Sequence, residues 1–359
     1  MHYSANTYNL WKKSIALILM LFSFSAFTCA DDEVVLTIGG NVYGGGNRGN
    51  LKGVTTVIVK SGTIEGDVYG GARMADVTPT STSSVITPFA DNPDFTLPSG
   101  YATHVLVWGG DLQNVYGGND ITGNIEGGTN VEVYSNVNGD VYGGGNGSYV
   151  YTDQSSLTDP AYADLYYEVE TGQTSAEALN DFRPNVDKTL VHIAGKSASQ
   201  PTILEGSVFC GGNSATLRAS SGAASAILQI GSHVVADNVF LGSNGENMVN
   251  DQTLQSYADN DISSLQLTNP GIFDEYMRCV DVSIMPQVSF DEDYVDQTAY
   301  IGSFFVGGNV GSMSAEGTFN LSFPKTVVIY DKLVGGCNNA NVAKSAYNAF
   351  HQGGLTAAA

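Results

Sequence analysis

The chain has 359 residues with a formal charge of −22, from 36 acidic and 14 basic side chains. A strongly acidic chain repels phosphate backbones, so the composition excludes nucleic acid as an expected partner. Of the four cysteines, Cys210, Cys279 and Cys337 lie beyond the N-terminal segment. This odd number at unrelated spacings is no disulfide framework and no zinc motif, and we expect Cys210 and Cys337 to be small, buried or half-buried residues.

Residues 1–30 are predicted to be a signal peptide. Lys12 and Lys13 precede an apolar run from Ile15 to Phe27, which is too short to span a bilayer, so no transmembrane span is expected. Two alternatives remain open. Cleavage after Ala30 would release residues 31–359, whereas lipidation of Cys29 would give the chain a lipid anchor in the outer membrane. Both alternatives predict a secreted or cell-surface protein, outside the cell.

A glycine-rich phrase organises residues 31–359. It is written in full as Gly-Asp-Val-Tyr-Gly-Gly-Gly-Asn at residues 139–146, and Tyr116 and Tyr142 of successive copies are 26 residues apart. A repeat of this length with no helical period predicts an all-β protein, a right-handed parallel β-helix (β-solenoid) of about eight coils. The eight copies begin at Gly40, Gly66, Asn114, Gly139, Ser207, Asn238, Ser303 and Lys332.

The alternation of side chains predicts which residues form the core. In Val131-Glu132-Val133 we expect Glu132 to face water, so that both valines face inward. Counting on from Val133 in steps of two places Val141 in the core and Tyr142 on the outer face. We also expect the Asn that ends each phrase to form a hydrogen-bonded ladder with its counterparts, about 4.8 Å apart. The predicted core ladder is Val42, Val68, Val115, Val141, Val208 and Val239.

Three insertions interrupt the predicted solenoid, at residues 74–103, 148–187 and 246–278. The first is rich in Thr, Ser and Pro and predicts an irregular loop. The second contains 174–182, which predicts one or two helical turns, and the third also predicts short helix. Insertions in repeat arrays tend to share a face, often the binding face. The stretch after residue 340 does not resemble a solenoid cap, so we expect the chain to be truncated at its C-terminus.

The export signal, the acidic Asp31-Asp-Glu33 and the repeated Gly-Asp-Val-Tyr-Gly-Gly-Gly-Asn with Val-x-Val strands resemble the glycine-rich β-helical cell-surface, adhesin-like proteins of gut Bacteroidetes. The stretches Ile301–Met313 and Val334–Asn341 are especially similar to the later coils of those proteins. The resemblance covers most of residues 31–359. It implies a right-handed parallel β-helix at the cell surface, and it implies no activity and no site residues.

A few acidic and histidine residues are candidates for catalysis or metal binding. Asp67 and Asp140 share a register that also accepts Asn and Ser, which is typical of a turn position rather than of a catalytic carboxylate. No Ser or Cys nucleophile motif matches His104, His192 or His233. We therefore expect these histidines to be ordinary core or surface residues. Calcium-binding turns end in Gly-x-Asp, which only residues 118–120 approach. The sequence therefore predicts no catalytic residues, no metal site and no cofactor.

The outer face offers the candidate binding residues. Tyr43, Tyr69, Tyr116 and Tyr142 fall at one register in four successive coils, and we expect an exposed row of rings that binds a ligand. The alternative is that the rings only stack and stabilise the coils. The predicted function is a non-catalytic, adhesin-like solenoid that binds glycans or host or bacterial surface proteins through this face and its inserted loops. The competing function is a polysaccharide-active enzyme, a lyase or glycoside hydrolase, on the same scaffold.

Overall fold

The structure is a computed structural model of the chain. It describes residues 36–80, 86–92, 94–149, 151–153, 164–219, 225–245, 280–284, 286–290, 299–315, 318–323, 327–338, 342–343 and 347–352. The predicted signal peptide with Cys29, the third predicted insertion, Cys279 and the residues after 352 lie outside these ranges. No helix within the described residues is long and apolar enough to cross a membrane.

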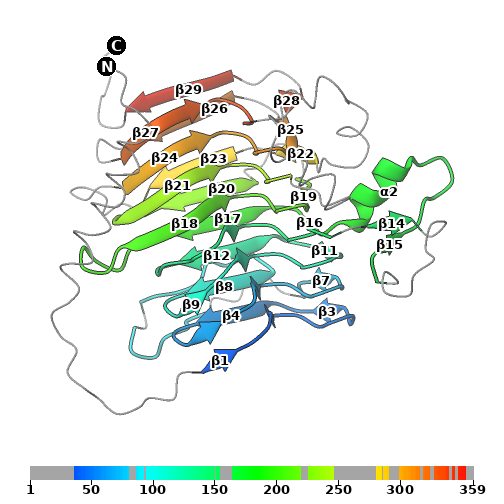
Figure 1. Ribbon diagram of the computed structural model, residues 1–359, viewed down its shortest axis with the longest axis horizontal. Helices are drawn as coiled ribbons and strands as arrows, with labels where there is room; N and C mark the ends of the chain where they lie inside the picture. Colours follow the sequence, from blue (N-terminus) through cyan, green and yellow to red (C-terminus); the bar gives the residue numbers. More distant parts are fainter. Residues whose placement is uncertain are drawn as a thin grey trace.

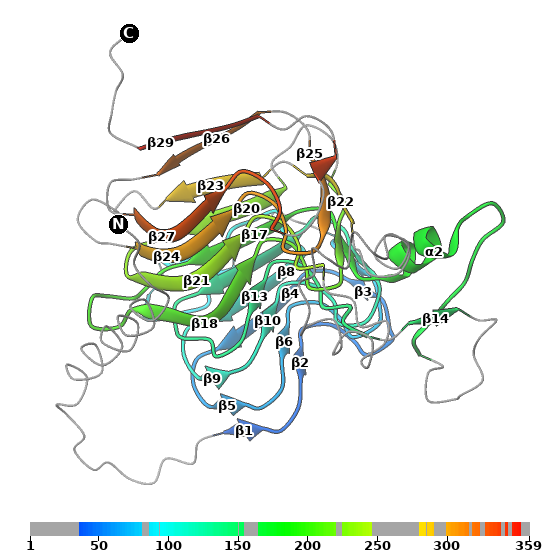
Figure 2. The ribbon, with the colours of Figure 1, turned by 45° about the horizontal axis from the view of Figure 1, so that its top comes forward.

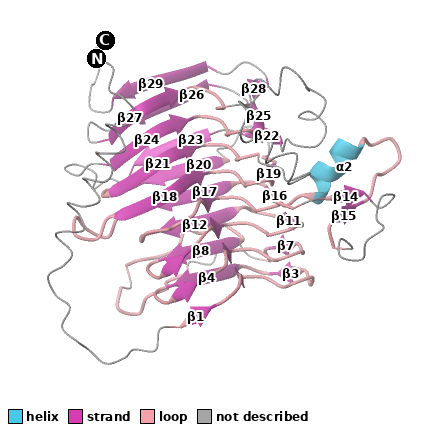
Figure 3. Cartoon of the chain, in the orientation of Figure 1, coloured by secondary structure: helices cyan, strands magenta, loops and turns pink. Residues whose placement is uncertain are grey.

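The chain forms stacked coils whose named strands all pair in parallel, as a β-solenoid requires (Figures 1 and 3). The eight copies of the glycine-rich phrase supply the eight strands of the largest sheet, so the predicted parallel β-helix of about eight coils is confirmed. The right-handed sense of the coils stays a prediction. The eight-stranded sheet contains β2 (Val42–Tyr43), β6 (Val68–Tyr69), β10 (Val115–Tyr116), β13 (Val141–Tyr142), β18 (Thr202–Phe209), β21 (Val234–Phe240), β24 (Ala299–Phe305) and β27 (Val327–Val334).

Further sheets run along the other sides of the solenoid (Figure 2). The six-stranded sheet contains β4 (Thr55–Val59), β8 (Thr103–Val107), β12 (Thr129–Val133), β17 (Thr189–Ile193), β20 (Ala226–Ile230) and β23 (Pro286–Phe290). The five-stranded sheet contains β3 (Leu51–Lys52), β7 (Val77–Thr78), β11 (Asn124–Ile125), β16 (Asn185–Val186) and β19 (Thr216–Leu217). A three-stranded sheet contains β1 (Thr37–Ile38), β5 (Thr63–Ile64) and β9 (Asp111–Leu112).

Two smaller sheets belong to the last coils. One contains β22 (Val280–Ile284), β25 (Ser312–Ala315) and β28 (Val342–Ala343), and the other contains β26 (Thr318–Phe323) and β29 (Tyr347–Gln352). In order along the chain, each early coil visits the six-stranded, three-stranded, eight-stranded and five-stranded sheets in turn. Every coil therefore places equivalent residues directly above those of the coil before it.

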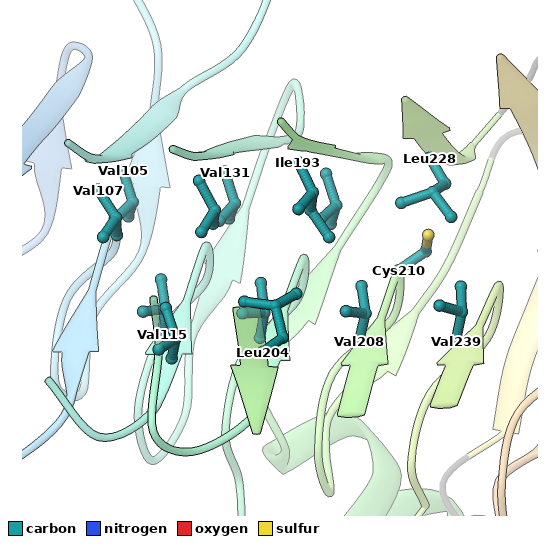
Figure 4. Close-up of a cluster of buried hydrophobic side chains, with 14 of the residues drawn as sticks. Val105, Val107, Val115, Val131, Ile193, Leu204, Val208, Cys210, Leu228 and Val239 are labelled. Atoms are coloured by element: carbon teal, nitrogen blue, oxygen red, sulfur yellow. The ribbon is translucent and has the colours of Figure 1, made fainter. Parts of the chain in front are cut away.

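The core is a set of aliphatic ladders between the eight-stranded and six-stranded sheets (Figure 4). The predicted ladder is confirmed, because Val42, Val68, Val115, Val141, Val208 and Val239 pair in one register. The last five belong to the buried core cluster, and half-buried Val42 packs against it. On the facing sheet, Val105, Val131 and Val191 align in the same way and are fully buried. Burial of such side chains stabilises the fold by about 1.5–3 kcal/mol each.

The predicted asparagine ladder is also present. The amide of each Asn donates to the side-chain oxygen of the equivalent residue in the preceding coil, with N···O distances of 2.8–3.2 Å. Asn47 and Arg73 occupy this register in the first two coils and are also joined by a hydrogen bond. The continuous part of the ladder is Asp120, Asn146, Asn213, Asn244, Asn309 and Asn338.

The first two predicted insertions leave the solenoid on two different sides. The second carries β14 (Thr152–Asp153), β15 (Tyr166–Tyr167) and α2 (Ser175–Phe182), which project beside the five-stranded sheet (Figure 1). Helix α2 begins where the sequence predicts helical turns, and Thr174 and Glu177 form a capping box at its N-terminus. The first insertion packs instead on the outer face of the six-stranded sheet. Strands β7 and β16 lie within the ranges predicted as insertions but pair as regular coil strands.

Candidate functional site

The predicted row of outward tyrosines forms a stack of rings, but the row is not exposed. Tyr69, Tyr116 and Tyr142 lie outside the valine core at one register and stack with ring centroids 4.7–4.8 Å apart. They are nevertheless only 0–3 % exposed, and Tyr43 at the end of the row is half-buried. The predicted exposure is therefore wrong. Phe209, Phe240 and Phe305 extend the same stack through the later coils.

The rings are buried because neighbours cover each side of them. The faces of each ring lie against the rings of the adjacent coils. At the hydroxyl ends, Tyr142 donates to Asp140 at 2.8 Å, and the amide of Asn146 donates to the Tyr69 hydroxyl at 3.0 Å. The row is thus enclosed from two directions. On one side lies the residue two positions before each tyrosine, such as Asp140 before Tyr142, and on the other lies the asparagine ladder. A ligand has no access to these rings, so they cannot form the candidate binding site.

Asp67 and Asp140 lie at the register that the sequence predicts to be a turn position. Oδ1 of Asp67 accepts from the backbone N–H of Asn114, and Oδ1 of Asp140 accepts from that of Ser207. Asn41 and Asn114 accept in the same way from the coil above each of them. This second ladder explains why Asn and Asp share the register, since each supplies an acceptor oxygen at the same position in its coil. At this register Ser303 instead donates its hydroxyl to Asp331.

Asp120, in the one turn that approached a calcium-binding pattern, is buried against protein donors. Its carboxylate accepts from the hydroxyls of Tyr43 at 2.7 Å and Tyr149 at 2.5 Å and from the amide of Asn146 at 3.1 Å. The carboxylate thereby anchors the second insertion to the solenoid. Among the described residues, no three His, Cys, Asp or Glu side chains are grouped as a metal site would require.

A second aromatic group lies on the outer face of the six-stranded sheet, and we call it the outer-face cluster. Trp108 and Tyr134 follow β8 and β12 and contact each other, with ring centroids 5.2 Å apart. Phe89 and Phe95 of the first insertion pack against Trp108 at 4.8 and 5.7 Å. Its apolar members are Ile58, Ile86, Phe89, Phe95, Leu97, Leu106, Trp108 and Tyr134. Phe95, Trp108 and Tyr134 keep part of their surface in contact with solvent.

Polar groups border the outer-face cluster directly. Glu132 Oε2 lies 2.6 Å from His192 Nδ1 in the next coil, and the Tyr134 hydroxyl lies 3.1 Å from both atoms. Glu132 does point to the outer face, as the alternation of side chains predicts, but the expectation that it meets water is wrong because its side chain is only 6 % exposed. The contacts with His192 and with the Tyr134 hydroxyl compensate for the desolvation of the carboxylate.

His104 and Asn130 lie on the same outer face, towards the start of the strands. Asn130 is fully buried, and its amide nitrogen is 3.3 Å from His104 Nδ1. Its Oδ1 atom has no hydrogen-bond partner among the described residues. Burial lowers the pKa of His104 to about 4, although the nearby Glu132 charge opposes this change. The imidazole is therefore neutral at physiological pH.

We expect His104 to make the fold sensitive to acid. Above about pH 6.5 the imidazole is neutral in both the folded and the unfolded chain. Between about 6.5 and 4 the unfolded chain binds a proton that the folded chain does not, so stability falls as the pH drops and the loss is complete below the folded pKa. His104→Asn should remove this contribution, which is up to about 3 kcal/mol. Urea unfolding at pH 7.5 and 4.5 should show a larger fall for the native chain, whereas equal falls would contradict the assignment.

Cys210 is buried and Cys337 is half-buried, as the sequence predicts. Cys210 packs in the aliphatic core, and burial raises the pKa of its thiol well above the usual range (Figure 4). A protonated thiol of this kind behaves as a small hydrophobic residue rather than as a nucleophile.

The outer-face cluster was missed in the sequence, although one signal was available. Trp108 and Tyr134 are 26 residues apart, which is the spacing that relates the glycine-rich phrases. They therefore occupy the same register in successive coils. The pairing of Glu132 with His192 carried no such signal, because the second insertion separates the two residues by 60 positions. The contribution of Phe89 and Phe95 depends on how the first insertion folds back, which no repeat encodes.

The fold and this site together define the chain as a parallel β-solenoid with an aromatic and polar patch on one face. No family model, no curated protein and no solved structure matches the chain.

Proposed function

We propose that the chain is a non-catalytic, adhesin-like solenoid, secreted or anchored at the cell surface, that binds a glycan on the outer-face cluster. One observation carries the proposal: the partly exposed rings of Trp108 and Tyr134, from successive coils, lie side by side on the outer face. Aromatic faces pack against the apolar faces of sugar rings, and adjacent polar groups bind sugar hydroxyls. Because stacked coils repeat at about 4.8 Å, the patch can extend along a chain of sugars.

The buried tyrosine row has no part in this proposal. Its rings are enclosed by the two polar ladders, so the alternative interpretation of a stabilising stack suits them better. The inserted loop remains part of the proposed binding surface, since Phe95 contacts both Trp108 and Tyr134.

Replacing Trp108 tests the site. Trp108→Ala removes the central ring of the outer-face cluster, and we expect affinity for the bound glycan to fall at least about tenfold. The first measurement is a screen of the secreted chain against glycans and surface proteins, followed by titration of the best ligand. Phe240→Leu is the matched control, because it alters the buried stack and should lower stability without changing affinity. Unchanged affinity in Trp108→Ala, or binding only to proteins, would contradict the proposal.

A polysaccharide-active enzyme is the second candidate function, and one contact favours it. Glu132 and His192 place an acid and a base on one face in adjacent coils, which is the arrangement that such chemistry uses. Against it, a hydrolase needs two carboxyl groups at a set separation, and Glu132 is largely covered by its partners. Release of reducing ends or unsaturated products from a polysaccharide, lost in Glu132→Gln, would favour the enzyme over the binding protein.

A further inference from the structure

Lysines border the aromatic surface of the outer-face cluster, although the chain as a whole is strongly acidic. Lys60 Nζ lies 4.6 Å from the centre of the Phe89 ring, and Lys196 Nζ lies 4.8 Å from that of Trp108. On the same face, Lys188 Nζ lies 4.6 Å from the centre of the Tyr101 ring. With only 14 basic side chains against 36 acidic ones, three lysines on one face form a local excess of positive charge.

These ammonium groups retain charge that a ligand can neutralise. Within the described part of the chain, none of the three lysines forms a salt bridge, whereas Arg48 and Arg218 each do. Lys196 donates to the backbone carbonyl of Trp108, a neutral acceptor, and burial lowers the pKa of its ammonium group. A partly desolvated cation without a counter-ion attracts an anion more strongly than a fully hydrated one does.

The acidic groups around the cluster do not cancel this excess. Glu132 is already paired with His192 and is largely shielded from solvent. Asp91 and Asp94 of the first insertion are exposed, so water and salt screen their charges. The net charge of the whole chain repels anions at long range, but at physiological ionic strength that field decays within about 8 Å. Short-range contacts with the lysines therefore decide which ligands are favoured.

We propose that the ligand of the outer-face cluster is an acidic glycan. Its sugar rings pack on Trp108 and Tyr134, and its carboxylate or sulfate groups pair with Lys60 and Lys196. This inference rests on the proposed function and adds the chemical class of the ligand. It distinguishes the site from one for neutral sugars, which would gain little from ammonium groups beside the aromatic rings.

Two matched pairs of polymers isolate the contribution of charge. Polygalacturonate is compared with its methyl ester, and dextran sulfate is compared with dextran, so that each pair keeps its backbone and loses its charge. We expect the secreted chain to bind at least one charged member at least tenfold more tightly than its neutral counterpart. The pair that responds identifies carboxylate or sulfate as the preferred anion.

Lysine variants connect that preference to the site. Lys60→Gln and Lys196→Gln combined should weaken binding of the charged polymer about tenfold or more and leave neutral polymers unaffected. Lys52→Gln is the control, because this exposed lysine lies on β3 of the five-stranded sheet. Equal binding of charged and neutral members, still lost in Trp108→Ala, would overturn the acidic ligand but retain glycan binding. Binding to no glycan at all would overturn both proposals.

Discussion

Gly117→Ala is expected to destabilise the solenoid by at least about 3 kcal/mol, a large part of the total stability of a typical domain. Gly117 follows β10 and passes directly beneath the next coil. An added Cβ would fall inside van der Waals distance of the Gly143 carbonyl oxygen and 2.8 Å from Val131 Cγ2. The coil cannot move away, because the backbone N–H of Gly117 donates to Tyr142 at 2.9 Å. The new methyl group must therefore break ladder hydrogen bonds or separate two coils.

The matched control is Gly40→Ala. Gly40 begins the first copy of the phrase, no atom lies within 4 Å of the position that its Cβ would take, and its φ is not in the left-handed region. We expect its free energy of unfolding to change by no more than about 0.5 kcal/mol, or to rise slightly as the unfolded chain loses freedom. Urea unfolding compares the two variants, and amide hydrogen exchange shows whether the loss is centred on β10 and β13. Similar results for both would contradict the steric explanation.

Tyr116→Ala is expected to cost about 3–5 kcal/mol, in the range of buried aromatic truncations. Its ring is 3 % exposed and has a stacked neighbour on each face, Tyr69 at 4.8 Å and Tyr142 at 4.7 Å. Truncation leaves a cavity in the middle of the stack and removes both ring contacts, each worth about 0.5–1.5 kcal/mol beyond burial. The coils on either side cannot collapse into the space because their backbones are held at the strand spacing.

Tyr43→Ala provides the comparison within the same stack. Tyr43 is half-buried and has one stacked neighbour, Tyr69, at 5.0 Å. The cost should be about half that of Tyr116→Ala, since less surface and one ring contact are lost. The thermal midpoint and the affinity for the glycan are measured together. A fall in stability with unchanged affinity supports a structural stack, whereas a loss of affinity in Tyr116→Ala would return the row to the binding site.

The two polar ladders explain why one glycine-rich phrase can recur with so little change. The phrase at residues 139–146, for example, supplies a core valine, a stacked aromatic ring and two ladder residues, and each of the four contacts its own counterpart in the preceding coil. A substitution in one coil therefore alters the contacts of both neighbouring coils. Three of the later phrases carry Phe in place of Tyr, which keeps the stacked ring, and the later phrases keep the ladder asparagine unchanged.

Much of the fold was predictable because a solenoid repeats its contacts. Val131 and Val133 could be assigned to the core from the side-chain alternation in one strand, and the 26-residue spacing aligned them with Val105 and Val107 in the neighbouring coil. The asparagine ladder followed from the same spacing, because equal positions in equal coils meet at the distance of a hydrogen bond. The candidate site was predictable only in part in this way, since Trp108 and Tyr134 keep the 26-residue spacing whereas Phe89, Phe95 and His192 do not.

The sequence by itself determined the parallel coils, their number, the valine core and the register of the tyrosine row, because local alternation and a fixed period encode all four. Only the tertiary structure decided what covers each outward side chain. Alternation assigns Tyr116 and Glu132 to the outer face, but their burial depends on the ladders and on neighbouring coils. The tertiary structure also decided that Phe89 and Phe95 contact Trp108, because the path of an insertion is set by long-range packing rather than by the repeat.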